Sequence, residues 1–68
     1  MVGVIRESKI EYCVVVEYPG GKRFCLAKFM HEEDARRYRR SRPREDYLKY
    51  LVYERREELP GEVTWVEL

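Results

Sequence analysis

The sequence predicts an α+β domain of order ββαββ, in which one helix packs on an antiparallel sheet in two layers. Two observations predict this fold class. Runs rich in β-branched and aromatic residues occur in two pairs, and each pair is separated by a glycine-containing turn. Between the pairs lies a charged segment in which acidic residues precede arginines, the order that a helix dipole favours. At 68 residues the chain is expected to form a single small domain, residues 1–68.

The first pair of runs is expected to form a β-hairpin. Residues 10–18, IEYCVVVEY, and residues 23–29, RFCLAKF, flank Gly20 and Gly21. Glycines supply the positive φ angles that tight hairpin turns require. Centring the turn on the two glycines also fixes the register, which pairs Val16 with Cys25, Val14 with Ala27 and Tyr12 with Phe29.

This register divides the hairpin into two faces. The face expected in the core carries Ile10, Tyr12, Val14, Val16, Tyr18, Cys25, Ala27 and Phe29. The second face carries Cys13, Val15, Phe24 and Leu26, diluted by charged residues. Cys13 and Cys25 are therefore expected on opposite faces, where they cannot form a disulfide, although a slip of one residue would change this.

Residues 31–41, HEEDARRYRRS, are expected to form a helix of about ten residues. Pro43 bounds the segment, because proline disfavours continuation of a helix. At 100° per residue, Ala35 and Tyr38 point to one side and the arginines occupy the opposite arc. Ala35 and Tyr38 are thus the residues expected to contact the sheet.

Residues 44–59, REDYLKYLVYERREEL, admit two interpretations. A helix is favoured by Pro43 near its start and by the i,i+4 pair of Glu45 and Lys49. A strand is favoured because the apolar residues would encircle a helix instead of forming a stripe. The closing run, residues 62–68, would complete a second hairpin. We favour the strand, and hence ββαββ, with ββααβ as the alternative.

Composition limits the classes of function. The net charge of +1 argues against a generally basic nucleic-acid-binding protein. No apolar run approaches the length of a membrane span, and no signal peptide is evident, so a cytoplasmic protein is expected. Cys13, Cys25 and His31 fit no ordinary zinc spacing. We expect no metal, no cofactor and no enzymatic activity.

An arginine cluster at residues 36–44 is the first candidate site. Its four members without an obvious acidic partner nearby are Arg39, Arg40, Arg42 and Arg44. They have three interpretations: a solvated helix end that complements its own dipole, a contact with a small anion or a nucleic acid, or a salt-bridged protein interface. The second interpretation makes the protein a weak nucleic-acid binder, which is the alternative function.

A surplus of apolar sheet surface is the second candidate site. A ten-residue helix, about 15 Å long, shields part of one sheet face and none of the other. Aromatic residues with neighbouring arginines are typical of interaction hot spots. The residues expected to bind a protein are Tyr47, Tyr53, Trp65, Arg55 and Arg56. The expected function is a protein-interaction module that binds a partner or itself as a homodimer, unless residues 1–5 fold over this face or the sheet curls enough to hide it.

In style the chain resembles small uncharacterised proteins encoded by phages of high-GC bacteria. The resemblance rests on VVVEYPGGKRF…AKFMHEEDARRY, a hairpin followed by a helix, and on YLVYERREEL…TWVEL, a closing hairpin. It identifies no named family and carries over no functional residue. By analogy, it implies a role in phage assembly or in contact with the host.

Overall fold

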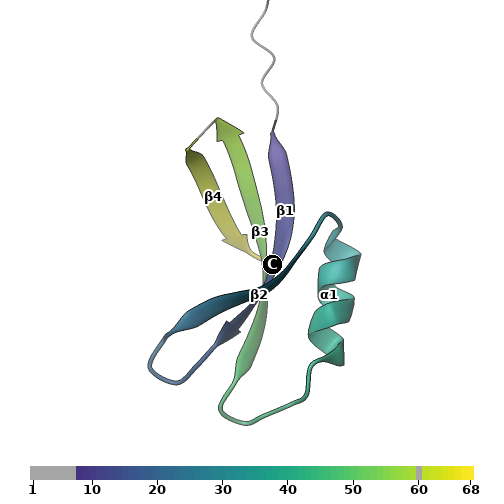
Figure 1. Ribbon diagram of the computed structural model, residues 1–68, viewed down its shortest axis with the longest axis vertical. Coiled ribbons are helices and arrows are strands. Elements are labelled where there is room, and N and C mark those ends of the chain that lie inside the picture. The colour runs from purple at the N-terminus through teal and green to yellow at the C-terminus, as the bar shows by residue number, and fades with distance from the viewer. Residues whose placement is uncertain (1–7, 60) are drawn as a thin grey trace, which may run out of the picture.

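The computed structural model describes residues 8–59 and 61–68. Its elements are β1 (Lys9–Glu17), β2 (Arg23–Phe29), α1 (Glu32–Ser41), β3 (Lys49–Leu59) and β4 (Glu62–Glu67). This is the predicted ββαββ order, with the helix beside one antiparallel sheet (Figure 1). The proposal that residues 1–5 cover the sheet lies outside the described residues.

The four strands form one sheet of order β2-β1-β3-β4, in which all neighbours are antiparallel. The two hairpins thus join through β1 and β3, which become the central strands. Val14 and Val52 lie opposite each other on this central pair and are almost completely buried. The long pairing of β1 with β3 therefore holds the two halves of the chain together.

The strand interpretation of residues 44–59 is confirmed for Lys49–Leu59, whereas residues 44–48 form the loop that leads into β3. The apolar residues that would encircle a helix instead alternate between the two faces of the sheet. Val52 packs in the core with the helix, and Leu51 points to the other face opposite Val15. A central strand accepts apolar residues on both faces, which a surface helix does not.

The turn between β1 and β2 uses its glycines as predicted. Gly20 and Gly21 have φ angles of 94° and 90°. The Gly21 N–H donates to the carbonyl oxygen of Tyr18 at 3.0 Å, so the tight turn is centred on Pro19 and Gly20. Proline followed by a glycine of positive φ is the signature of a type II turn. The turn centre is thus one residue earlier than expected.

The predicted register of the first hairpin is confirmed for the pairs far from the turn and is wrong for the pairs near the turn. Tyr12 pairs with Phe29 and Val14 with Ala27, as predicted. The pairing then shifts between Val14 and Val15, so Val16 lies opposite Phe24 and not opposite Cys25. The shift leaves one extra residue in β2, which is the property of a β-bulge.

The bulge corrects the predicted faces of two residues. Cys25 pairs with Val15 and so shares a face with Cys13, contrary to the expectation that the cysteines point to opposite sides. Phe24 moves to the helix-bearing side, where its ring contacts that of Tyr18 at a centroid distance of 5.6 Å. Both cysteines are free thiols.

The helix packs on the sheet through Ala35, as predicted. Ala35 is fully buried against Val14 and Val52, and Tyr38 packs at the margin of this core together with Tyr12 and Phe29. Within the described part of the chain, α1 contacts β1, β2 and β3 but not β4. Among the elements of residues 8–59 and 61–68, one helix thus leaves the fourth strand and the second face of the sheet without a covering helix or strand (Figure 1).

Candidate protein-interaction face and arginine pocket

The sheet face opposite α1 is called here the open face. The strand register places on it Cys13, Val15, Cys25, Leu51, Tyr53 and Trp65. Charged side chains of both signs lie on the same face around these residues. Apolar and charged residues of this face alike occupy every second position of their strands, and the positions between them face the helix. The open face is therefore an apolar centre with a polar margin, the arrangement that protein interfaces share.

A groove of about 260 Å³ lies on the open face. It is lined by five residues of the open face, Val15, Arg23, Cys25, Tyr53 and Trp65, and also by Phe24, which the register places on the helix-bearing side of the edge strand β2. Tyr53 and Trp65 meet edge to face at a centroid distance of 6.4 Å, and the Arg55 guanidinium lies 5.8 Å from the centre of the indole. Trp65 is held by these contacts, yet 49% of its surface is exposed.

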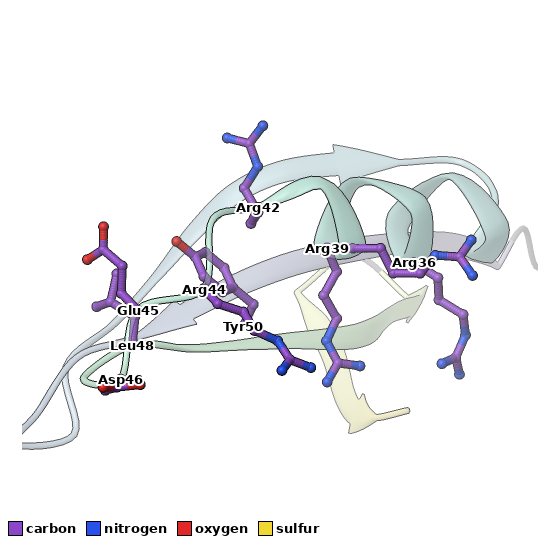
Figure 2. A pocket seen from close by; sticks show the side chains of 9 residues that line it. Arg36, Arg39, Arg42, Arg44, Glu45, Asp46, Leu48 and Tyr50 are labelled. Atoms are coloured by element: carbon purple, nitrogen blue, oxygen red, sulfur yellow. The ribbon is translucent and has the colours of Figure 1, made fainter.

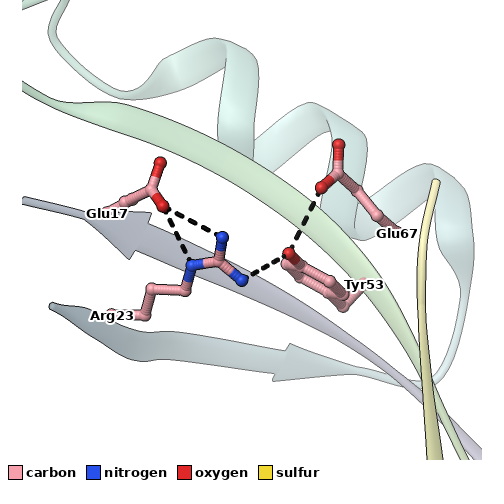
Figure 3. Close-up of polar contacts among 4 residues, drawn as sticks. All are labelled: Glu17, Arg23, Tyr53 and Glu67. Atoms are coloured by element: carbon pink, nitrogen blue, oxygen red, sulfur yellow. Dashed lines mark hydrogen bonds and ion pairs between the residues drawn. The ribbon is translucent and has the colours of Figure 1, made fainter. Parts of the chain in front are cut away.

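A chain of polar contacts crosses the open face (Figure 3). The Arg23 guanidinium donates to Glu17 at 3.0 Å and to the Tyr53 hydroxyl at 2.9 Å, and this hydroxyl donates to Glu67 at 3.2 Å. Burial raises the pKa of Tyr53, and the bond to Glu67 adds to the effect, whereas the positive charge of Arg23 opposes it. The phenol is therefore a neutral donor at physiological pH.

The open face carries a burial that the sequence did not predict. Arg23 lies on β2 and Tyr53 on β3, so their contact spans the intervening strand β1. On this face Cys13 is completely buried and Val15 is 8% exposed, whereas both were expected on an uncovered face. Burial, aided by the neighbouring Cys25, raises the pKa of the Cys13 thiol to about 11.

The structure brings together three of the five residues expected to bind a protein. Tyr53, Trp65 and Arg55 share the open face. Arg56 points to the opposite face, where it pairs with Glu54 at 3.6 Å. Tyr47 lies in the loop before β3 and is 61% exposed.

Sequence reasoning missed Arg23 and Cys25 as members of the open face. Cys25 was assigned to the other face by the unbroken register, and only the bulge places it beside Val15. Arg23 reaches Tyr53, a residue that is distant in the sequence, so no local pattern indicates their contact. Glycine often marks a bulge, but β2 contains none.

A second candidate site lies between the end of α1 and the loop that follows it (Figure 2). This arginine pocket has a volume of about 530 Å³. Five arginines line it: Arg36, Arg39, Arg40, Arg42 and Arg44. All four members of the predicted arginine cluster thus meet at one cavity, although they come from a helix and a loop.

Carboxylates near the arginines divide them into two groups. Among the described arginines, Arg23, Arg36, Arg37, Arg55 and Arg56 each lie within 4.0 Å of a carboxylate oxygen. Within residues 8–59 and 61–68, Arg39, Arg40, Arg42 and Arg44 have no such partner. The four arginines without a carboxylate partner are the same four that the sequence singled out, and all of them line the pocket.

Arg42 differs from the other arginines of the pocket. Its guanidinium lies 4.4 Å from the centre of the Tyr38 ring, a cation–π distance. Its Nε is buried without a hydrogen-bond partner. In Figure 2 the Arg42 side chain extends away from Arg39 and Arg44, which point to a common side. Arg42 therefore fixes the start of the loop against the helix, and Arg39 and Arg44 present free guanidinium groups.

Other kinds of site find no support in the described residues. No group of three or more His, Cys, Asp or Glu residues in residues 8–59 and 61–68 is arranged to hold a metal ion. No helix in this part of the chain is both long and apolar enough to cross a membrane.

Comparison of the chain with protein-family models, with curated proteins and with solved structures gives no match. The resemblance to small phage-encoded proteins stays a prediction.

Proposed function

We propose that the protein is a non-enzymatic protein-interaction module that binds a second copy of itself through the open face. The observation that carries this proposal is the half-exposed Trp65 at the wall of an apolar groove. Exposed tryptophan beside tyrosine and arginine is the composition of interface hot spots. Covering the exposed indole with another molecule is favourable, since burying an aromatic side chain contributes roughly 2 kcal/mol or more to the free energy of association.

The position of Trp65 beside the groove favours a second copy as the occupant. A two-fold contact brings the same patch of both molecules together, so a projecting group and its receptor must lie on one surface. Trp65 projects from the open face, and the groove over Val15 lies next to it. Two copies related by a two-fold axis can therefore each place Trp65 at the groove of the other.

The charges of the open face are also compatible with self-association. Its acids are Glu11, Glu17, Glu57 and Glu67, and its bases are Lys9, Arg23, Lys28, Lys49 and Arg55. Because the two signs nearly balance, a second copy meets no large field of like charge. The ion pair of Arg23 and Glu17 at 3.0 Å also leaves the margin of the groove locally neutral.

The size of the sheet sets the expected affinity. Four strands about 4.8 Å apart, with lengths of 9, 7, 11 and 6 residues, give a planar face of roughly 19 by 27 Å. This is roughly 500 Å² per copy, below the roughly 800 Å² that a standard stable interface buries on each partner. We therefore expect a dimer with a micromolar dissociation constant, which is dissociated in dilute solution.

Sedimentation equilibrium of the wild type and of Trp65→Ser tests the proposal. The wild type should shift from monomer to dimer as its concentration rises through the micromolar range. Trp65→Ser should weaken the dimer at least about tenfold, because it removes the central aromatic contact. Tyr47→Ser is the matched control: it removes a more exposed aromatic residue that lies in the loop before β3 and does not line the groove, and should leave the dimer unchanged.

Two results would contradict self-association through this face. One is a wild-type protein that stays monomeric up to about millimolar concentration, far above the expected dissociation constant. The other is a dimer that Tyr47→Ser weakens as much as Trp65→Ser does.

A further inference from the structure

We propose that the arginine pocket binds the phosphate of a nucleotide unit, either free or within a single strand of nucleic acid. This site lies at the end of α1 on the helix-bearing side of the sheet, apart from the open face. It is therefore a second binding function, separate from self-association.

The electrostatics of the pocket call for an anion. Arg39, Arg40 and Arg44 line one cavity, and no carboxylate oxygen of the described residues lies within 4.0 Å of them. Like charges gathered in one place repel each other, and a bound anion would relieve the repulsion. The helix dipole accounts only in part for this cluster, because α1 ends at Ser41 and Arg44 lies beyond it.

The arrangement of the guanidinium groups is suited to phosphate. Arg39 on the last turn of α1 and Arg44 on the loop point to the same side of the chain (Figure 2). Each planar guanidinium can donate two parallel N–H bonds to phosphate oxygens. The stacking of Arg42 on Tyr38 holds the intervening loop in place, so the two free groups are partly positioned before the ligand binds.

The other lining residues of the pocket indicate a ligand that carries neutral polar and aromatic groups in addition to its anionic group. Glu45 and Asp46 also line it, and their carboxylates would repel a ligand with negative charge throughout. They would accept hydrogen bonds from hydroxyl or amino groups, which sugars and bases supply. Leu48 and Tyr50 add an apolar and aromatic surface for a base, and about 530 Å³ exceeds the needs of phosphate alone.

The pocket can be tested by ¹H–¹⁵N NMR titration with three probes: inorganic phosphate, adenosine monophosphate and a twelve-residue oligothymidylate. We expect chemical-shift changes at residues 36–50, and not on β4, with adenosine monophosphate or the oligonucleotide saturating at lower concentration than phosphate. Arg39→Gln with Arg44→Gln should weaken this binding at least tenfold. The control carries the same charge change outside the pocket, in Arg37→Gln with Arg56→Gln.

The probes separate the two sources of the phosphate. A strand held by three arginines should bind with a slope of log K against log salt of about −2, at roughly −0.7 per contact. A free nucleotide is the ligand if adenosine monophosphate binds at least as tightly as the oligonucleotide. The proposal is overturned if no probe shifts residues 36–50, if inorganic phosphate alone binds as well as the other two, or if the control double variant loses binding equally. The sedimentation results above do not depend on any of these outcomes.

Discussion

Cys13 is completely buried, although it lies on the sheet face that no helix covers. Its neighbours are side chains of the same face, among them Lys28 and Tyr53 opposite it on the adjacent strands and Cys25, which acts on its thiol. The consequence is chemical, because burial raises the pKa of the thiol to about 11. The charged form of Cys13 is thus disfavoured in the folded state, and the thiol behaves as a small core residue.

This pKa predicts how stability changes at alkaline pH. A thiol with a pKa of 9.0 in the unfolded chain and about 11 in the folded one holds its proton longer when folded. Its contribution is present below pH 9 and is lost as the pH rises from about 9 to 11, by an amount on the order of 2–3 kcal/mol. The raised pKa of Tyr53 acts in the same direction.

Urea unfolding of the reduced wild type and of Cys13→Ala between pH 8 and pH 10.5 checks this prediction. The variant should be less stable than the wild type at pH 8, because it leaves a small cavity, and the difference should narrow as the pH rises. If the free energies of unfolding of the two proteins change in parallel with pH, the protonation of Cys13 does not contribute to stability and the prediction is wrong.

Among the elements, the existence of each strand and of the helix could be predicted from the sequence, but the register of the first hairpin could be predicted only as far as Val14. Two β-rich runs around Gly20 and Gly21 are typical of a hairpin, and the acid-to-arginine order is typical of a helix. The bulge in β2 has no glycine or other local signal. It decides the face of Cys25 and Phe24, and so part of the site.

The close approach of α1 to the sheet depends on a small residue at its centre. Ala35 is fully buried between the helix and the valines of β1 and β3. Ala35→Leu should lower the free energy of unfolding by about 1–3 kcal/mol, because the larger side chain forces the helix away from the sheet. Thermal and urea unfolding measure the loss.

Arg37→Leu is the matched control for this overpacking. It introduces the same side chain on the same helix at a position whose side chain is 75% exposed. This substitution should change the free energy of unfolding by no more than about 0.5 kcal/mol, as most surface substitutions do. Equal losses for the two variants would mean that helix propensity or solubility, and not packing, sets the stability.

At the scale of the whole molecule, one helix covers three of the four strands on one face of the sheet. The sequence predicted this mismatch from helix length and strand number alone. It did not predict that the other face would bury its own centre and carry the contact of Arg23 with Tyr53, leaving Trp65 exposed beside a groove. That contact joins residues that only the strand order brings together. The exposed apolar surface of the open face is consequently smaller than expected, and it is concentrated at Trp65 and the groove.

The most direct measurement of the central claim is an isotope-filtered NOE experiment on a mixed sample of labelled and unlabelled protein at millimolar concentration. If two copies meet through the open face, the Trp65 indole of one copy gives intermolecular NOEs to the methyl groups of Val15 and Leu51 in the other. If the sample is dimeric and the intermolecular NOEs arise instead from α1 or the loop before β3, the open face is not the interface and the account is contradicted.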